Sequence, residues 1–125
     1  MRMAVREDPY IAHILDQLGG FGPVRARAMF GGHGLYLHGV MFALVADETL
    51  YFKTDAANRG AFEEAGMGPF VYENKGRKVA MSYHEAPADA LEDAEALHEL
   101  ARGAYAAAQR AKAAGPRRPR GRRPA

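Results

Sequence analysis

Residues 40–46 have the sequence VMFALVA, in which no side chain is charged or polar. A strand that is apolar on both of its faces belongs in the middle of a sheet, where other elements cover it from both sides. A half-exposed strand would instead alternate apolar and polar residues. The stretch therefore predicts the central strand of a sheet, and the segments on either side of it should supply the neighbouring strands.

The segments before this strand show the period of two that is typical of strands. They predict one strand over residues 24–30 and a second over 33–37, separated by Gly31-Gly32. His38-Gly39 is expected to form a two-residue hairpin turn into the central strand. The pairs predicted for that hairpin are Leu37 with Val40, Tyr36 with Met41, and Leu35 with Phe42.

The chain after the central strand turns back at Asp47-Glu48-Thr49. We prefer a turn of three residues, which places alternate side chains of the central strand and of the next strand on the same face of the sheet. The residues expected to share this face are Val40, Phe42, Leu44, Leu50 and Phe52. Tyr51 and Lys53 then point to the opposite face. A slip by one residue would move each side chain of the next strand to the other face.

Helices are predicted before, within and after the strands. The first begins at the Asp8-Pro9 cap and the last, long one at Asp93, ending at Gly115-Pro116. A middle helix is expected to be capped by Thr54 or Asp55, to carry Ala57, Ala61, Phe62 and Ala65, and to end at Gly66.

A second hairpin should pair residues 70–73 with 78–83 around a four-residue turn at 74–77. The order is then α-β(4)-α-β(2)-α. It predicts an α+β domain, a two-layer sandwich in which helices pack on one face of a largely antiparallel sheet.

Length and composition fit one small globular domain, which we expect over residues 1–115. The chain has 125 residues, 48% of them hydrophobic, and no cysteine. A chain without cysteine has no disulfide and no thiolate nucleophile, and it suits a reducing compartment, so we expect a cytoplasmic protein. No apolar run approaches the roughly 18 residues of a membrane span, so no membrane association is predicted.

The basic charge is concentrated at the end of the chain. The formal net charge is +2, but the last ten residues hold five arginines and no acid, so the rest of the chain is net negative. These arginines are Arg117, Arg118, Arg120, Arg122 and Arg123. We expect residues 116–125 to be a disordered tail rich in arginine and proline. Such a tail binds nucleic acid weakly and without sequence preference, although a merely solubilising role explains it too.

The residue types that carry catalysis do not form a recognisable set. The histidines stand in separate predicted elements and none has the spacing of a helical metal pair; they are His13, His33, His38, His84 and His98. Ser82 and His84 share one side of a strand, but nothing marks an oxyanion hole near them. The glycines of residues 30–34 lead into a strand, whereas a phosphate loop leads into a helix. We therefore expect no catalytic residue, no metal and no cofactor.

The face of the sheet opposite the core combines basic, aromatic and methionine side chains. Its predicted members are Arg25, Arg27, Met29, Tyr36, His38, Met41, Tyr51 and Lys53. Single-stranded nucleic acid could stack on such a face, a protein partner or second copy could dock there, or another element could cover it. We favour a partner interface or a cover, because the aromatic signature of RNA-binding sheets is missing.

Several short motifs together carry a resemblance to a known family. They are MFGG at 29–32 followed by GLY at 34–36, LYFK at 50–53, Asn58 and Phe62, Pro69, Phe70 and Tyr72, and MSY at 81–83. With these motifs residues 27–87 closely resemble the N-terminal domain of the TfoX/Sxy family, and the flanking helices agree more weakly.

The resemblance implies a two-layer α/β domain like those of secretion chaperones. Founding members of the family regulate natural competence together with the cyclic-AMP receptor protein and carry a C-terminal helical domain, whereas this sequence resembles a stand-alone N-terminal domain. We expect a non-enzymatic regulatory or protein-interaction domain, linked to transcription of competence genes. The alternative is a small-ligand or enzymatic site near residues 31–36 that uses Arg27, Tyr36, His33 or Lys53.

Deleting residues 116–125 is expected to weaken binding to a labelled DNA duplex at low salt, because the deletion removes five phosphate-binding guanidinium groups. The difference between the two chains should shrink at higher salt, where counterion release favours binding less. Fluorescence anisotropy at two salt concentrations measures both effects. Equal affinities of the full and shortened chains for the duplex would contradict the prediction that the tail binds nucleic acid.

Overall fold

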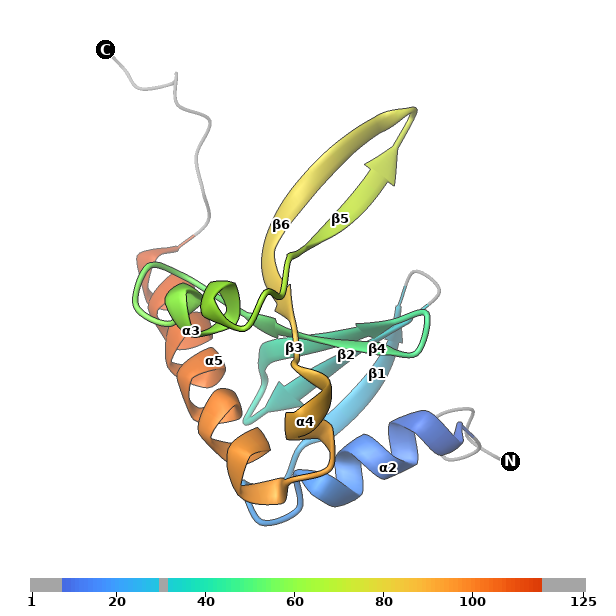
Figure 1. Cartoon of the computed structure of the whole chain (residues 1–125), viewed down its shortest axis with the longest axis vertical. Coiled ribbons are helices and arrows are strands. Elements are labelled where there is room, and N and C mark those ends of the chain that lie inside the picture. The colour runs from blue at the N-terminus through green and yellow to red at the C-terminus, as the bar shows by residue number, and fades with distance from the viewer. Residues whose placement is uncertain (1–7, 30–31, 116–125) are drawn as a thin grey trace.

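The computed structural model describes residues 8–29 and 32–115, which form one six-stranded antiparallel sheet and four helices (Figure 1). The strand order is β1-β2-β3-β4-β6-β5. The elements are α2 (Pro9–Gln17), β1 (Arg25–Met29), β2 (Gly32–Leu37), β3 (Val40–Ala46), β4 (Thr49–Lys53), α3 (Arg59–Glu64), β5 (Pro69–Asn74), β6 (Arg77–Glu85), α4 (Ala88–Leu91) and α5 (Ala94–Ala114). The predicted α+β order is confirmed, with the short α4 as an unpredicted addition.

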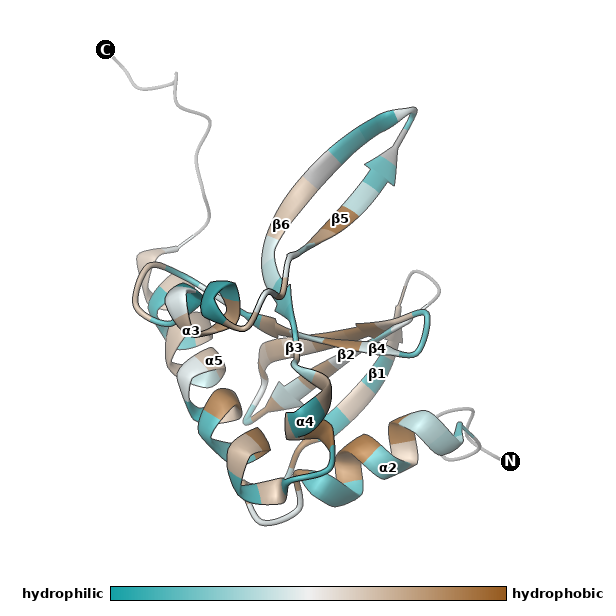
Figure 2. Cartoon of the chain, viewed as in Figure 1, coloured by the Kyte–Doolittle hydropathy of each residue, from teal (hydrophilic) through white to brown (hydrophobic). Residues whose placement is uncertain are grey.

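The strand β3 lies inside the sheet, as its sequence predicts, between β2 and β4. Its residues Phe42, Ala43, Leu44 and Val45 are all buried. On one side of the sheet, apolar residues of β2, β3 and β4 form a single core with the helices (Figures 1 and 2). The helix side chains of that core include Ile11, Ile14, Phe62, Leu97 and Ala104. We call this side the helix face and the opposite side the outer face.

A β-bulge lies between β2 and β3. Tyr36 pairs with Met41 as predicted, but Leu35 pairs with Ala43, so the predicted pair of Leu35 with Phe42 is wrong. The extra residue, Phe42, packs in the core with Phe21 and Phe52. A bulge of this kind places two successive side chains of one strand opposite a single partner residue. It sends both Phe42 and Ala43 to the helix face, which leaves Met41 and Leu44 on the outer face.

The turn from β3 to β4 has two residues, Asp47 and Glu48, and not the predicted three. Both have positive φ, 52° and 54°, as the tight turns that suit twisted hairpins require. Leu50 consequently pairs with Val45, and Leu44 pairs with Tyr51 on the outer face. The prediction that Leu44 joins Leu50 in the core is therefore wrong.

The two long helices begin where their capping residues predict. The Asp8 carboxylate accepts hydrogen bonds from the backbone N–H of Tyr10 and Ile11, and Asp93 does the same for the start of α5. The middle helix is shorter than predicted. It begins after Asn58, because the Asp55 carboxylate accepts from the N–H of Ala57 within a turn and from Arg110. Ala57 accordingly lies outside the helix, and Gly66, with φ of 79°, follows its end.

The hairpin of β5 and β6 forms an arm that leaves the sheet (Figure 1). Its turn is Lys75-Gly76, two residues and not the predicted four. Only the last part of β6 joins the sheet, where Tyr83, His84 and Glu85 pair with β4. Apart from a bond from the N–H of Thr54 to the carbonyl oxygen of Ser82, the remaining residues of both strands pair within the hairpin, and the arm stands over the outer face (Figure 1).

The last helix ends where its sequence predicts, since α5 runs to Ala114 and Gly115 is its C-cap. The five arginines of the predicted tail lie outside the described residues. No helix in residues 8–29 or 32–115 is both long and apolar enough to cross a lipid bilayer.

Gly32 is expected to be a position that tolerates no side chain. A Cβ atom there would lie 2.2 Å from the carbonyl oxygen of Val45, so the backbone of β2 or β3 would have to shift. Gly32→Ala should lower the free energy of unfolding by about 1–3 kcal/mol. The matched control is Gly60→Ala in α3, where a Cβ meets nothing within 4 Å. It should leave stability unchanged or raise it by up to about 1 kcal/mol.

Urea unfolding of the three proteins measures both effects. Equal stabilities of the Gly32→Ala variant and the unchanged chain would contradict the close approach of β2 and β3.

Candidate functional site

The structure brings the predicted face residues together on the outer face. Arg25, Arg27 and Met29 alternate along β1 opposite Tyr36, Gly34 and Gly32 of β2, and Tyr36 pairs in turn with Met41. On the other side of β3, Tyr51 pairs with Leu44, and Lys53 pairs with Tyr83 of β6. Directly paired residues share one face of an antiparallel sheet. Only His38 departs from the prediction, because it lies exposed in the turn after β2 with φ of 51°.

Gly34 forms the floor of the outer face. A Cβ atom on it would lie 2.9 Å from the sulfur of Met29, 3.0 Å from the sulfur of Met41 and 3.1 Å from the ring of Tyr36. These three side chains therefore lie directly over the backbone of β2. The glycine permits a flat, apolar centre between strands that carry arginine at one edge and lysine at the other.

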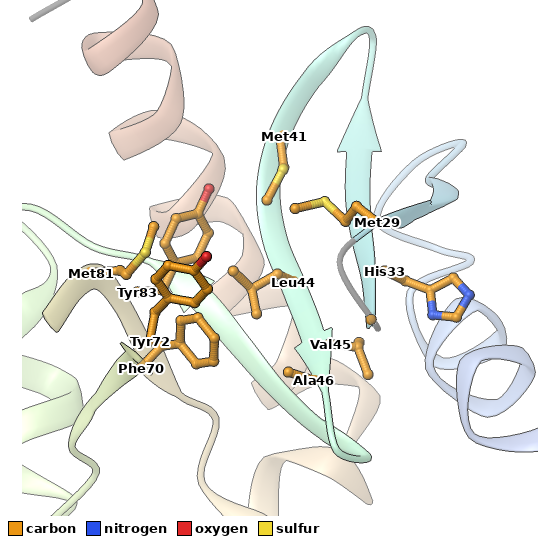
Figure 3. Close-up of a pocket in the computed structure, with 11 residues that line it drawn as sticks. Met29, His33, Met41, Leu44, Val45, Ala46, Phe70, Tyr72, Met81 and Tyr83 are labelled. Carbon is orange, nitrogen blue, oxygen red and sulfur yellow. The ribbon is translucent and has the colours of Figure 1, made fainter. Parts of the chain in front are cut away.

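A cavity of about 350 Å³ lies between this centre and the arm (Figure 3). The sheet contributes Met29, Met41 and Leu44, and the arm contributes aromatic and methionine side chains. The full lining is Met29, Gly32, His33, Met41, Leu44, Val45, Ala46, Phe70, Tyr72, Met81 and Tyr83. Figure 3 shows the His33 ring turned away from the arm, so the tyrosine hydroxyl groups are the polar side-chain atoms of this lining that lie on the side of the arm.

Seven of these residues were not among the predicted site residues: Leu44, Val45, Ala46, Phe70, Tyr72, Met81 and Tyr83. The period of two in residues 70–73 and 78–83 indicates a common face for the aromatic and methionine side chains of the arm. It does not show which side of the sheet that face meets, because the direction of the arm depends on the three pairs between β6 and β4.

The base of the arm is fixed by aromatic and polar contacts. The rings of Tyr51 and Phe70 meet edge to face with centroids 4.8 Å apart. The Lys53 ammonium lies 5.2 Å from the centre of the Tyr83 ring and donates a 2.7 Å hydrogen bond to the Ser82 hydroxyl. Burial raises the pKa of Tyr83 to about 12, so the phenol stays neutral at any physiological pH.

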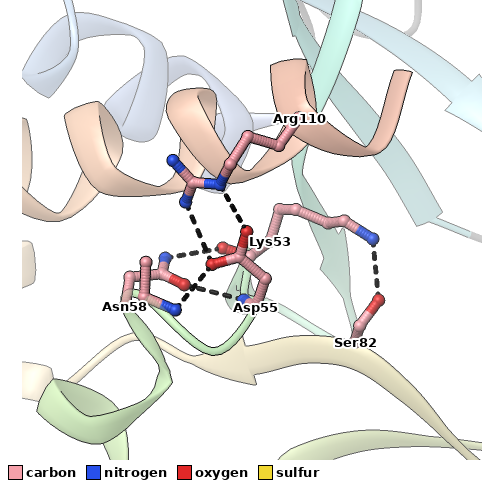
Figure 4. A network of polar contacts seen from close by, with 6 residues as sticks. Lys53, Asp55, Asn58, Ser82 and Arg110 are labelled. Atoms are coloured by element: carbon pink, nitrogen blue, oxygen red, sulfur yellow. Dashed lines mark hydrogen bonds and ion pairs between the residues drawn. The ribbon is translucent and has the colours of Figure 1, made fainter. Parts of the chain in front are cut away.

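The position of Lys53 depends on a polar network behind the sheet (Figure 4). The Asn58 side-chain amide donates to the carbonyl oxygen of Lys53, and its oxygen accepts from the N–H of Asp55. Arg110 of α5 holds the Asp55 carboxylate by two hydrogen bonds of 2.7 and 3.0 Å. These bonds hold the pKa of Asp55 below its usual value. The network joins the end of β4 to α5.

Positive charge gathers at one end of the outer face. The guanidinium carbon of Arg27 lies 5.4 Å from the centre of the Tyr36 ring, a cation–π contact that turns the charge toward the end where β1 begins. Arg25 pairs with Tyr36 at the same end. Lys53 and Lys112 line one depression there with Met41 and Tyr83.

The side chains of Ser82 and His84 have different partners. Ser82 is exposed and bonded to Lys53, whereas His84 is buried and shares a 2.9 Å hydrogen bond with the Thr54 hydroxyl. Burial lowers the pKa of His84, which favours the neutral ring. Both contacts have a plain structural purpose. Among the described residues, no group of three His, Asp or Glu side chains is placed to hold a metal ion.

The four residues of the alternative site do not converge. His33 lines the cavity under the arm, Arg27 and Tyr36 lie around a separate depression, and Lys53 lies around a third. Gly31 lies outside the described residues. The four candidates named for the alternative site, Arg27, Tyr36, His33 and Lys53, therefore lie around different depressions and are not brought together.

Comparison with known proteins identifies the family. The model of the TfoX N-terminal domain matches residues 16–108, from the end of α2 to the second half of α5. The match includes the whole sheet, the arm and the cavity. No curated protein sequence matches the chain. Because the matched segment is most of the 125 residues, the chain belongs to the TfoX N-terminal domain family.

Proposed function

We propose that this chain is a non-enzymatic protein-interaction domain that binds its partner on the outer face, between the sheet and the arm. The observation that supports the proposal is the apolar cavity of about 350 Å³ together with the exposed side chains of the arm. Val71 is 49% exposed, Tyr72 41% and Met81 38%. Because these residues are already more than half buried, covering each of them gains less than the roughly 1.5–3 kcal/mol of a fully exposed apolar side chain.

The kinds of side chain on the outer face also suit a protein partner. Tyrosine, methionine and arginine are enriched in protein interfaces relative to the rest of protein surfaces. Three methionines line the cavity, and their unbranched side chains adapt to the shape of whatever enters it. Basic residues at the rim of the face help to orient an approaching partner and do not need to be buried for this.

The regulatory part of the proposal rests on the family. Founding members of the TfoX/Sxy family regulate competence, and we extend to this chain a role in the regulation of transcription through protein contacts. A chain without cysteine suits a reducing compartment, so we place this function in the cytoplasm.

A second candidate function is the binding of a small apolar molecule in the same cavity. Its volume lies within the range of about 300–1,000 Å³ found for ligand pockets. Such a ligand would contact Leu44, Phe70 and Met81. Because the side chains it touches are apolar, the affinity of such a ligand would come from apolar contact.

Photo-crosslinking inside cells tests the proposal. A photoreactive phenylalanine analogue replaces Tyr72, which lines the cavity and is exposed, and in a control chain it replaces Glu99 on the solvent side of α5. We expect Tyr72 to yield protein crosslinks that the Glu99 position does not give. Met81→Glu in the same chain should reduce that yield about tenfold, because it places a charge in the apolar cavity.

Equal protein crosslinking at both positions, or none at Tyr72, would contradict an interaction role for the outer face. A crosslinked product heavier than the chain by only a small molecule would instead support the second candidate.

A further inference from the structure

We propose that the partner of the outer face is a second copy of this chain, docked face to face with its strands antiparallel to the first. This inference rests on the proposed function and specifies its partner. The strongest support is the distribution of charge along the strands, which differs between the two ends of the outer face.

The basic end lies where β1 begins and β4 ends. Arg25 and Lys53 stand at these strand ends, the Arg27 guanidinium turns toward Tyr36, and Lys112 lies beside Lys53. Three of the four are well exposed, and Lys53 is half-buried. The charge at this end is therefore open to an approaching molecule.

The acidic side lies toward the opposite end, where the turn between β3 and β4 carries Asp47 and Glu48, both exposed. Glu85 of β6 is also exposed and pairs with Tyr51. Burial and then the charges of Glu85 and Asp47 raise the pKa of Tyr51 on the outer face, whereas burial and then the charge of Glu48 raise the pKa of Tyr10 on α2.

A two-fold axis parallel to the sheets and perpendicular to the strands brings each basic end over the acidic end of the other copy. A contact that is made twice by the same surfaces is the usual interface of a homodimer. If the strands ran parallel, basic would meet basic and acidic would meet acidic, which costs several kcal/mol for close pairs. Between the two charged ends, the apolar centres over Gly34 would face each other.

The size of the face implies that the arm takes part. Strands about 17 Å long and about 4.8 Å apart give β1 to β4 an area of roughly 300 Å². A stable interface buries about 800 Å² on each partner. The arm provides further apolar surface through Val71, Tyr72 and Met81. We therefore expect each arm to close over the other copy and the cavity to receive apolar side chains of that copy.

Charge reversal tests the proposal. The proposed axis lays each strand over the same strand of the other copy, so Lys112, which lies beside Lys53 at the end of β4, meets Asp47 in the turn before β4. Lys112→Glu alone and Asp47→Lys alone should each raise the dimer dissociation constant about 100-fold, because each change creates two like-charge contacts. An equimolar mixture of the two variants should restore a dimer, since all its contacts again join opposite charges.

Sedimentation equilibrium over a range of protein concentrations measures the mass of each sample. Controls on the helix side, Arg102→Glu in α5 and Glu64→Arg in α3, exchange exposed charges away from the outer face and should leave the dimer intact. The double variant Lys112→Glu with Asp47→Lys should also form a dimer. Circular dichroism melting of each variant shows that it is folded.

An unchanged chain that stays monomeric at every concentration would overturn the second-copy proposal. So would a dimer that neither reversal weakens, or a mixture of folded variants that does not associate. Crosslinks from position 72 to a different protein would then support the interaction role but contradict the second copy as the partner. The absence of any protein crosslink would contradict both proposals.

Discussion

The apolar character of β3 on both sides is the constraint on which the rest of the structure depends. No side chain from Val40 to Ala46 can form a hydrogen bond with water, so both sides of the strand need to be covered by other parts of the protein. The helices supply one cover through a continuous core. The bulge at Phe42 decides the division, because it directs Phe42 and Ala43 to the helices and leaves Met41 and Leu44 on the opposite side.

The cover on that opposite side is incomplete. The arm reaches over Leu44 with Phe70, Tyr72, Met81 and Tyr83, but it leaves a cavity of about 350 Å³ beneath it. This apolar space is partly open to solvent, with the exposed side chains of Tyr72 and Met81 at its rim. In our proposal it is half of an interface. The hydrogen bond of Lys53 to Ser82 and the contact between Tyr51 and Phe70 attach the base of the arm to the sheet.

Local patterns predict most of the fold. The central position of β3, the caps at Asp8 and Asp93 and the membership of the outer face follow from alternation and capping chemistry. The bulge at Phe42 could not be predicted, because an alternating ladder without it has the same sequence pattern. The start of α3 could not be predicted either, since Asp55 is engaged by Arg110, 55 residues later. The cavity depends on where the arm lies over the sheet, and three residue pairs between β6 and β4 decide that position.

The central claim is that the outer face of one chain contacts the outer face of another. Nuclear Overhauser effects in a mixed sample, in which half of the chains carry ¹³C-methyl methionine and half are unlabelled, measure such contacts directly. The account predicts intermolecular signals from the methyl groups of Met29, Met41 and Met81 to tyrosine rings, and none from Met67, which packs against the core. Intermolecular signals at Met67 alone, or at no methionine, would contradict it.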